Sequence, residues 1–500
     1  MSTTTTNPRL RTYDALILGS GQAANPLATT LASTGRKTCV VESVHVGGCC
    51  INEGCTPTKT LIASGRVAYL ARRAADYGVR LEGKVGIDMT RVKGRRDGIV
   101  ETFRGGGERR LAAAGVEVLM GRAKFVGVKE VAVALRDGGE EVRCKAEWVF
   151  VNVGERPVTP RIEGLEEVMG RVPGKVLDST GIQALEEVPE RLLVLGGGYV
   201  GLEFAQLFAR LGSNVTVVQR GKKLLPREDP EIAEELRKIL VEDGLEVICE
   251  AEATHISTSN DTETPITLTI KSSATGATSE HKASHILLAT GRRPNTDTLN
   301  LEATGLSTDK KGHIPVSPDL STAVPGIWAL GDVKPGPSFT HVSYDDFRIV
   351  RDNLGLLPNP SSSSLDKPTA RTLEGREKIL PYVVYTDPQL GHVGLHAHDI
   401  PASSPLRTEK RLKVAKMPMS WVARALETDE PRGMMKAVVD GESGEILGFT
   451  CLGIEGGEIM SVVQMAMMGG VKWWELREAV WAHPTLAESL NNLWGSLEDV

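Results

Sequence analysis

Apolar and polar positions follow one another in the same order in two stretches of the chain, Tyr13–Ser43 and Arg191–Arg220. Each stretch opens with a run rich in Leu and β-branched residues, which predicts a buried parallel strand. Glycines at a tight turn, a segment with helical period and a second apolar strand follow. This order is that of a dinucleotide-binding fold, so we expect two nucleotide cofactors.

The pattern also predicts the organisation of the remaining chain. A strand-rich region ends in Val149–Gly164, and a related strand, glycine and Arg-Pro pattern recurs at Ser284–Asp297. We interpret these as the points where the chain leaves and re-enters the first domain. Residues 257–282 are polar and partly alternating, which predicts a solvated β-meander. From about Ile379 a final unit of strands and Met-rich helices is expected.

Composition narrows the class of protein. A chain of 500 residues exceeds one hydrophobic core, and 41% hydrophobic with 24% charged residues is typical of globular proteins. A net charge of −6 does not favour nucleic acid or a polybasic membrane anchor as partner. No apolar run has the length of a membrane span, and the N-terminus lacks a secretory apolar region. Seven mostly isolated cysteines indicate a reducing compartment, so we expect a cytoplasmic protein.

The first glycine loop follows a predicted strand and opens a predicted helix. Gly19 permits a sharp turn, Gly21 lets the backbone approach a pyrophosphate, and Ala24 allows close helix–strand packing. Glu42 ends the next strand, 23 positions after Gly19, where a carboxylate can accept both ribose hydroxyls. A glycine-rich β-turn does not account for Glu42, so we interpret the loop as a nucleotide site.

The second loop contains Gly196, Gly198 and Gly201 but has a different ending. No acid closes the following strand; Gln219 and Arg220 stand there, and Lys222, Lys223 and Arg227 come just beyond. Guanidinium and ammonium groups suit a 2′-phosphate, so NADPH is favoured over NADH. A solvated basic turn is the alternative, and Gly201 in the third glycine position argues mildly for NADH.

Cys50 and Cys55 are separated by four residues at the start of a long helical pattern. In a regular helix they would rise about 7.5 Å apart on diverging faces, too far for a disulfide. The helix must therefore start irregularly, which Gly54 permits and Pro57 supports. Cys55 is then at a helix N-terminus, where the dipole stabilises a thiolate, as an electron relay requires. Two buried structural thiols are the alternative.

The segment Gly47–Lys59 closely resembles the redox box of the class I flavoprotein disulfide reductases, the family of glutathione reductase, lipoamide dehydrogenase and mercuric reductase. The resemblance covers nearly the whole chain in the family's order and includes both glycine loops, Ala289–Asn295 (ATGRRPN), Ala329–Asp332 (ALGD) and His483–Glu488 (HPTLAE). It implies an α/β fold with two Rossmann-like dinucleotide-binding domains and a C-terminal α+β dimerisation domain. We predict an FAD-binding domain at 1–165 and 290–355, an NAD(P)-binding domain at 166–289, a flexible linker at 356–375 and an interface domain at 376–500.

The resemblance also implies roles for individual residues. Cys50 would attack the substrate, and Cys55 would be the charge-transfer thiol against the flavin. Lys59 and Glu203 would form an ion pair beside the flavin. Tyr199 would be a lid that moves aside for the nicotinamide.

On the cofactor side, Asp332 would bind the ribityl chain, Ala123 would meet the adenine, and His341 would place backbone at the flavin pyrimidine edge. His483, oriented by Glu488, would be the acid–base partner of Cys50 in the other subunit of a homodimer. A His followed five residues later by Glu across a Pro turn is itself consistent with an oriented imidazole. The other glycines assigned to cofactor binding are Gly48, Gly154, Gly291 and Gly331.

Two departures from the family pattern are informative. Cys49 stands where the family usually has Thr or another non-thiol. The C-terminus lacks the vicinal cysteines with which mercuric reductase collects its metal. The segments 339–354, 457–470 and 483–494 resemble the mercuric-reductase-like branch that contains the reactive-chlorine-resistance flavoprotein.

The predicted function is an FAD-dependent oxidoreductase that passes electrons from NADPH to the Cys50–Cys55 disulfide. From there they would reduce a small-molecule disulfide or a thiophilic metal ion. The alternatives are oxidation of a dithiol in the reverse direction and a catalytically silent FAD-binding protein. Retention of both cysteines, His483 and Glu488 argues against the silent protein, and a flavin monooxygenase has no use for the pair. No residue is predicted to hold a resident metal.

Overall fold

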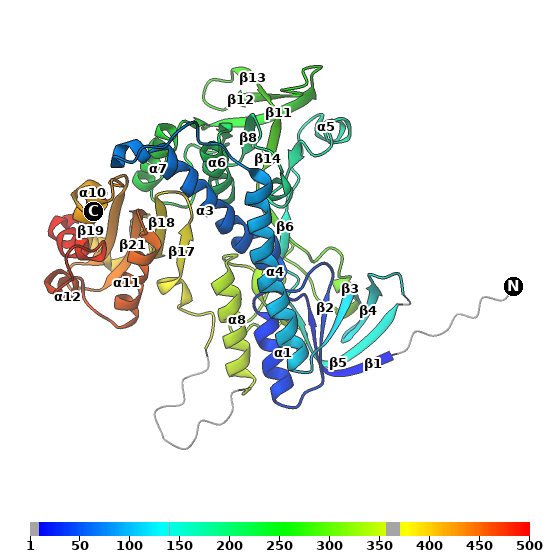
Figure 1. Ribbon diagram of the computed structural model, residues 1–500. Helices are drawn as coiled ribbons and strands as arrows, with labels where there is room; N and C mark the ends of the chain where they lie inside the picture. Colours follow the sequence, from blue (N-terminus) through cyan, green and yellow to red (C-terminus); the bar gives the residue numbers. More distant parts are fainter. Residues whose placement is uncertain (1–9, 140, 357–370) are drawn as a thin grey trace. The chain divides into compact units, whose positions relative to one another are not determined.

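A computed structural model of the chain describes residues 10–139, 141–356 and 371–500 (Figure 1). The predicted linker at 356–375 lies mostly outside the described residues. Contacts divide the chain into two compact units. The first unit comprises Met1–Thr60, Gly94–Val158 and Gly291–Glu374, and the second comprises Leu61–Lys93, Thr159–Thr290 and Gly375–Val500.

The first unit is built on a six-stranded sheet. Its strands are β1 (Leu10–Leu18), β2 (Thr38–Glu42), β3 (Glu117–Gly127), β4 (Glu130–Leu135), β5 (Val142–Val151) and β16 (Ile327–Ala329). Strands β3, β2, β1, β5 and β16 pair in parallel in that order, and β4 is antiparallel to β3 and β5. The short strands β6 (Glu155–Pro157) and β15 (Arg292–Pro294) pair with each other, so the two Arg-Pro segments are neighbours in this unit.

Both faces of this sheet are buried. Along β1, Leu16 and Leu18 face one hydrophobic cluster, while Ala15 and Ile17 face another. The second cluster is covered by α1 (Ala24–Ser33), α8 (Thr340–Asn353) and the C-terminal part of α4 (Met89–Ala113). A strand covered on both faces needs a continuous apolar run rather than an alternating one, which explains the pattern of β1.

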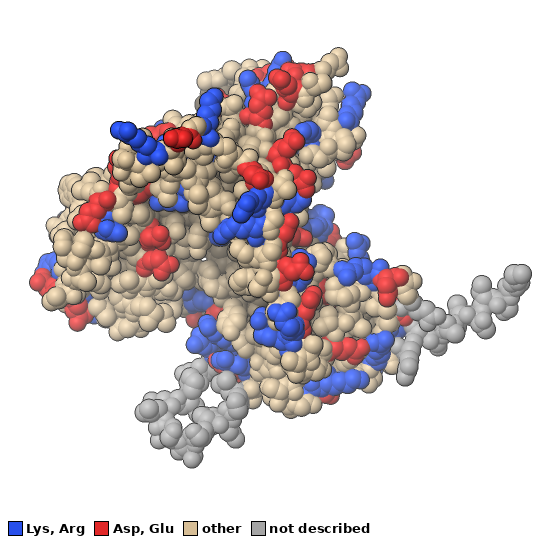
Figure 2. All heavy atoms as spheres, viewed as in Figure 1, with Lys and Arg blue, Asp and Glu red and all other residues tan. Residues whose placement is uncertain are grey.

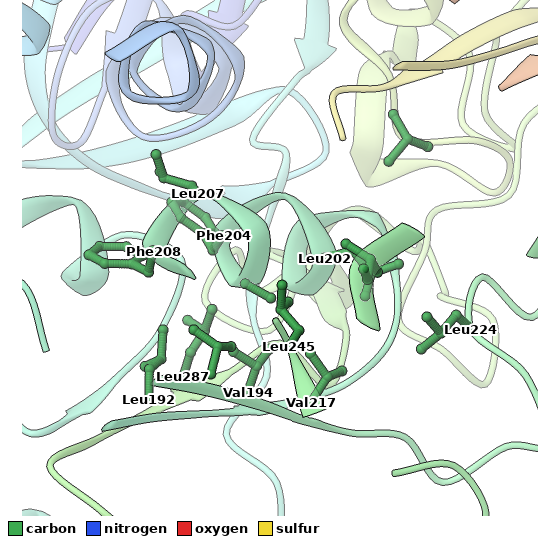
Figure 3. Close-up of a cluster of buried hydrophobic side chains, with 14 of the residues drawn as sticks. Leu192, Val194, Leu202, Phe204, Leu207, Phe208, Val217, Leu224, Leu245 and Leu287 are labelled. Carbon is green, nitrogen blue, oxygen red and sulfur yellow. The ribbon is translucent and has the colours of Figure 1, made fainter. Parts of the chain in front are cut away.

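The second unit contains a five-stranded parallel sheet in the order β10-β9-β8-β14-β7. The strands are β7 (Val176–Leu177), β8 (Arg191–Leu195), β9 (Asn214–Val218), β10 (Glu246–Ile248) and β14 (His285–Leu288), and the helices of this region are α5 (Leu165–Arg171), α6 (Tyr199–Leu211) and α7 (Pro230–Glu242). Phe204 and Phe208 of α6 pack in one cluster with Val194 and Val217 of the sheet (Figure 3). Helix α6 is buried along most of its length, including its polar residues Glu203, Gln206 and Arg210.

An antiparallel meander of β11 (Ala251–Thr258), β12 (Ile266–Ser272) and β13 (Thr278–Ala283) follows in the same unit. It confirms the meander predicted from the polar, alternating residues 257–282. The meander begins at Ala251, earlier than predicted. The prediction missed its first residues because Ala251 and Ile256 bury their side chains and lack the polar pattern.

The C-terminal part of the second unit is a six-stranded sheet in the order β17-β18-β21-β20-β19-β22, packed against α11. The strands are β17 (Pro381–Val384), β18 (Gln389–Gly394), β19 (Leu412–Pro418), β20 (Met434–Asp440), β21 (Ile446–Gly453) and β22 (Glu498–Asp499). The helices are α9 (Pro405–Thr408), α10 (Ala423–Glu427), α11 (Gly456–Met468), α12 (Trp473–Glu478) and α13 (Leu490–Leu493). Short 3₁₀ turns occupy Ala74–Tyr77, Gly181–Ala184, Leu301–Thr304, Gly331–Val333, Arg376–Ile379, Ala397–Asp399, Met419–Trp421, Ala487–Ser489 and Trp494–Ser496.

The composition predicts neither a strongly basic surface nor a membrane-spanning helix. On the face drawn in Figure 2, Lys and Arg are interspersed with Asp and Glu. Within the described residues, no helix has both the length and the apolar character needed to cross a membrane.

Candidate active site

The first glycine loop connects β1 to α1, as predicted. Gly19 has a φ of +92°, and a Cβ at this position would lie 2.3 Å from the Asn152 carbonyl oxygen, so only glycine fits. Ala24 is the first residue of α1 and is buried. The N-terminus of α1 therefore offers the backbone N–H groups that bind a phosphate.

The Glu42 carboxylate lies at this loop. It is buried at the end of β2, where its Oε2 accepts hydrogen bonds from the Ser20 N–H at 3.0 Å and from the Ser20 hydroxyl at 2.6 Å. Its Oε1 accepts from the Val44 N–H at 2.8 Å. A carboxylate has about four acceptor positions, so acceptor capacity remains for a ribose hydroxyl.

Gly48 and Asn152 complete a cradle around Gly21. Gly48 begins the short helix α2 (Gly48–Asn52), and a Cβ on it would lie 2.7 Å from Gly21 Cα. The side-chain amide of Asn152 donates to the Leu330 carbonyl at 2.8 Å, while its buried Oδ1 accepts no hydrogen bond from the described residues. A buried acceptor beside a glycine-lined loop suits a hydroxyl of FAD. Asn152 could not be identified from the sequence, because its partner is a backbone carbonyl far along the chain.

Asp332 lies in the 3₁₀ turn at Gly331–Val333, where burial raises the pKa of its carboxyl. The turn is held by Asp346, whose Oδ2 accepts from the Gly331 N–H at 2.8 Å and pairs with Lys334 Nζ at 3.1 Å. Asp346 and Lys334 are fully buried, and neither was predicted to serve the site. They position the segment that carries Asp332.

The first unit also holds the other residues predicted for the flavin. Ala123 is half-buried in β3, and Gly154 and Gly291 have φ values of +64° and +132°. The Asn295 N–H donates to the Gly154 carbonyl at 3.0 Å. His341 is exposed at the start of α8, and its ring stacks on Phe339 with 5.4 Å between centroids.

The cysteine segment starts irregularly, as the spacing predicts. Cys50 lies in α2, the backbone turns at Gly54, and α3 (Cys55–Arg72) begins at Cys55 with Pro57 in its first turn. A Cβ at Gly54 would lie 3.1 Å from Cys50 Cα, so the turn is tight. Both sulfurs are present as free thiols.

Thr340 joins the two cysteines. Its hydroxyl donates to Cys50 Sγ at 3.0 Å and lies 3.5 Å from Cys55 Sγ. The hydrogen bond with Cys55, followed by burial, raises the pKa of the Cys50 thiol, and the Thr340 hydroxyl opposes this effect. The sequence did not identify Thr340, because the first turn of α8 has no cysteine-related motif.

Cys49, the departure from the family pattern, is exposed and faces a cation. Arg292 Nη2 lies 3.5 Å from Cys49 Sγ. The same guanidinium is anchored to Glu155, with Nε 2.7 Å from Oε1 and Nη2 2.9 Å from the carbonyl oxygen. The Arg-Pro segment at β15 thus places a positive charge beside the third thiol.

The second glycine loop joins β8 to α6 in the second unit. Gly196 has a φ of +116°, and a Cβ on it would lie 2.3 Å from the Ala289 carbonyl oxygen. A Cβ on Gly201 would lie 2.1 Å from the Gly196 carbonyl oxygen, so α6 packs directly on the loop. Gly198 precedes α6 and has open space around its Cα, which leaves room for a phosphate.

Gln219 occupies in this unit the position that Glu42 occupies in the first. Its side-chain oxygen accepts from the Gly197 N–H at 3.0 Å, and its amide donates to the Lys223 carbonyl at 3.2 Å. The Ser20–Glu42 contact in the first loop and the Gly197–Gln219 contact in the second each join a loop residue to the residue 22 positions later. The second loop therefore has a neutral amide where the first has a carboxylate, and Arg220 beside it is exposed.

Tyr199 and Glu203 lie in the first turns of α6. Tyr199 is exposed at 39%, and its role as a lid stays a prediction. Glu203 is buried, and its Oε1 accepts from the Tyr385 N–H at 2.8 Å. Lys59 is in α3 in the first unit, and its ion pair with Glu203 stays a prediction.

His483 and Glu488 are paired near the C-terminus. His483 Nδ1 lies 2.9 Å and 3.0 Å from the two carboxylate oxygens of Glu488. The imidazole side chain is 68% exposed. The carboxylate fixes the Nδ1–H tautomer, so Nε2 can accept or donate a proton.

The fold and these residues define a class of protein with two dinucleotide sites and a dithiol next to the first of them. Comparison with known proteins identifies the family. Residues 13–346 match the pyridine nucleotide-disulphide oxidoreductase family, and residues 380–493 match the dimerisation domain of that family. The chain belongs to the pyridine nucleotide-disulphide oxidoreductases, a family of FAD-dependent enzymes that use a pyridine nucleotide and act on disulfides.

Several relatives cover almost the whole chain. It is 33% identical over 488 residues to the probable pyridine nucleotide-disulfide oxidoreductase RclA of Escherichia coli, covering 96% of this chain and 98% of that protein. It is 32% identical to a dihydrolipoyl dehydrogenase of Thermus scotoductus, and the match covers 96% of each chain. It is also 32% identical to a mercuric reductase of Staphylococcus aureus, and that match covers 96% of this chain and 81% of the relative. The solved Cu(II) complex of the HOCl-induced flavoprotein disulfide reductase RclA C43S mutant from E. coli matches with a TM-score of 0.83, 31% identity and coverage of 97% and 99%.

Proposed function

We propose that this chain is an NADPH-dependent flavoprotein reductase that uses Cys50 and Cys55 to reduce an external disulfide or a thiophilic metal ion. One observation carries the proposal. Gly48, at the start of the helix that contains Cys50, packs so closely on Gly21 that a Cβ would lie 2.7 Å from Gly21 Cα. The helix that contains Cys50 therefore packs directly against the loop that would bind the FAD pyrophosphate.

The FAD would be held by Gly19, Gly21, Glu42, Asn152 and Asp332. When bound, it supplies the two-electron chemistry between the nicotinamide and the protein disulfide. Each of these residues has the hydrogen-bonding group or open backbone that its part of the cofactor needs.

The dithiol chemistry follows from the protein's own groups. The Cys50 thiolate attacks one sulfur of a substrate disulfide, and the first thiol of the substrate leaves with a proton. The Cys55 thiolate then attacks Cys50 in the mixed disulfide, which forms the Cys50–Cys55 bond and releases the second thiol. His483, with its tautomer set by Glu488, would take the proton from Cys50 and return it to a leaving thiolate.

The coenzyme preference rests on Gln219. A carboxylate at this position accepts ribose hydroxyls and repels a 2′-phosphate, whereas an amide does not repel it. Arg220 and Lys222 are exposed next to it, and Arg227 follows. These residues favour NADPH over NADH.

The substrate class is drawn from the site and its relatives. Proteins that resemble this chain are named mercuric reductase, and the solved RclA complex contains Cu(II). Here Cys49 adds a third exposed thiol beside the redox pair, which suits a soft or borderline metal ion. Other relatives are named dihydrolipoyl dehydrogenase. Oxidation of a dithiol, the reverse direction, is therefore a second candidate function.

We further propose a homodimer in the cytoplasm. His483 is exposed on a segment within the region that matches the dimerisation domain, so it can serve the partner's Cys50. An odd number of mostly isolated cysteines suits a reducing compartment.

Anaerobic titration with NADPH followed by a substrate panel tests the function. Two-electron reduction should give a long-wavelength thiolate–flavin absorbance, and NADPH should be consumed with a generic disulfide, Hg²⁺ or Cu²⁺. A Cys50→Ser variant is the matched control, because it retains the cofactor residues. Turnover that is the same in this variant would contradict the proposed route. Reduction of NAD⁺ by a dithiol, without reduction of any panel member, would favour the reverse direction.

A further inference from the structure

One side of α8 contacts both the redox cysteines and a turn of the candidate FAD site. Thr340, Ser343 and Asp346 are spaced three residues apart, so they follow one another along this side of the helix. Thr340 donates to Cys50 Sγ at 3.0 Å, whereas Ser343 and Asp346 reach the 3₁₀ turn at Gly331–Val333. All of these residues belong to the first unit. A single helix therefore connects two parts of the site that are far apart along the chain.

Ser343 packs against the turn at the point where it carries Asp332. The Ser343 hydroxyl donates to Asp332 Oδ1 at 3.5 Å. Gly331 has a φ of +72°, and a Cβ on it would lie 3.1 Å from Ser343 Oγ and 2.7 Å from Asn152 Nδ2. The turn is thus packed between α8 and Asn152 without room for a side chain. Because packed protein interiors transmit a displacement to their neighbours, a shift of the turn moves the helix as well.

Asp346 fixes the same turn with a buried charge. Its Oδ2 accepts from the Gly331 N–H at 2.8 Å and lies 3.1 Å from Lys334 Nζ. The side chains of Asp346 and Lys334 are 0% and 1% exposed. A buried ion pair is costly to break, because each charge would then stay in the interior without its partner. The pair therefore determines where α8 lies against the turn.

We infer that Asp346 is a positioning residue through which α8 couples the FAD site to the hydrogen bond between Thr340 and Cys50. This inference rests on the proposed function, in which the turn at Asp332 holds FAD and Cys50 attacks the substrate. FAD bound at Asp332 fixes the turn, and the contacts of Ser343 and Asp346 then keep the Thr340 hydroxyl against the sulfur. When these contacts are lost, the Cys50 thiolate loses its donor. By linkage, the thiolate form binds FAD more tightly than the thiol form by the same factor.

The sign of the expected effect separates positioning from direct electrostatics. Asp346→Asn removes a negative charge and leaves the Lys334 ammonium in excess. That excess charge by itself would stabilise the Cys50 thiolate and lower the pKa of Cys50. Loss of the Thr340 donor acts in the opposite direction and raises this pKa. A higher pKa in the variant is therefore specific to the positioning role.

Two measurements on full-length, FAD-loaded protein test the coupling. Dissociation of FAD is followed by the recovery of flavin fluorescence, and Asp346→Asn should release FAD about fivefold faster or more. After reduction of the protein with a phosphine, the pH dependence of iodoacetamide alkylation gives the pKa of Cys50, and mass spectrometry distinguishes this thiol from those of Cys49 and Cys55. The pKa of Cys50 should be higher by about 0.7 in Asp346→Asn, the shift that corresponds to a fivefold coupling. Neither measurement uses NADPH or a substrate, so a failure here is distinct from a failure of the proposed function.

Three further variants locate the effect. Ser343→Ala removes a contact without leaving a buried charge, so it should change both quantities in the same direction, and it decides if Asp346→Asn does not fold. Tyr344→Phe is the matched control, because Tyr344 is the next residue of α8 but is 40% exposed, and both quantities should stay as in the parent. In a Thr340→Val background, Asp346→Asn should still release FAD faster but should no longer raise the pKa of Cys50. A pKa of Cys50 that neither Asp346→Asn nor Ser343→Ala raises, or a rise that persists without the Thr340 hydroxyl, would overturn the coupling.

Discussion

The Thr340 hydroxyl donates a hydrogen bond to Cys50 Sγ over 3.0 Å and lies 3.5 Å from Cys55 Sγ. Thr340 is the first residue of α8, so the position of that helix is coupled to the ionisation of the redox pair. A donor to sulfur stabilises the thiolate, and removal of the hydroxyl must act against the nucleophile.

Replacement of Thr340 tests this coupling. Thr340→Val retains the shape but removes the donor, so the pKa of Cys50 should rise by roughly one to two units, as the loss of a charge-assisted hydrogen bond implies. The pH dependence of iodoacetamide alkylation in the NADPH-reduced protein measures this shift. Thr340→Ser should restore the original profile. Identical profiles for Val and Thr would show that the hydroxyl does not act on the thiol.

The assignment of Cys55 can be tested by spectroscopy. Cys55→Ser should abolish the long-wavelength absorbance that appears on two-electron reduction, while FAD stays bound, because the charge is expected on Cys55. Cys50→Ser should show the band already in the oxidised protein, because Cys55 would be a thiolate there without any reduction. If the band survives in the Cys55 variant, the roles of the two cysteines are wrongly assigned.

Coenzyme choice should depend on the end of β9. Arg220→Ala should lower kcat/KM for NADPH by about 1.5–3 kcal/mol, roughly 10- to 150-fold, with little effect on NADH. Gln219→Glu should shift preference toward NADH, because it places a carboxylate where Glu42 stands in the other loop. Steady-state kinetics with both coenzymes distinguish these effects. Equal losses for NADPH and NADH would mean that Arg220 does not contact the 2′-phosphate.

Cys49 should affect the turnover of metal ions but not the reduction of small organic disulfides. With Cys50 reduced, the adjacent exposed thiol can help to bind a soft or borderline ion. Cys49→Thr should slow turnover of Hg²⁺ or Cu²⁺ by roughly tenfold, about 1.4 kcal/mol in the barrier. A small organic disulfide should be reduced at nearly the original rate. Unchanged kinetics with both substrate types would assign Cys49 to packing.

Stability should depend on Asp387, which pairs with Arg66 at 2.6 Å and with Arg210. Although burial opposes the shift, Arg210 and Arg66 lower the pKa of Asp387. Its stabilisation is therefore present above the unfolded pKa of about 3.9 and is lost as the pH falls toward the folded value. Asp387→Asn should cost about 1.5–3 kcal/mol at neutral pH, because Arg66 and Arg210 each lose one carboxylate partner and keep Glu430 and Asp243, respectively.

Denaturant unfolding at pH 7 and at pH 3, below the unfolded pKa, measures this effect. The difference between the parent protein and Asp387→Asn should shrink at the lower pH. Asp76→Asn, which changes an exposed partner of Arg73, should alter the midpoint very little. A pH-independent difference between parent and variant would falsify the electrostatic explanation.

The sequence by itself determined the features that depend on local backbone physics. Gly19 and Gly196 could be assigned to sharp turns because a strand precedes each and a helix follows, and both have positive φ. The four-residue spacing of Cys50 and Cys55 required a break in the helix, and α2 ends before α3 begins at Cys55. The meander near residues 257–282 was likewise evident from alternation, although its first residues were missed.

Only the tertiary structure decided which distant residues complete each site. Thr340 reaches the cysteines, and Asn152 reaches the glycine loop, through contacts between segments far apart in the chain. Sequence patterns report the conformation of neighbouring residues, whereas these sites arise from the packing of sheets and helices. A single side chain at the end of an element has no periodicity by which its distant partner could be recognised.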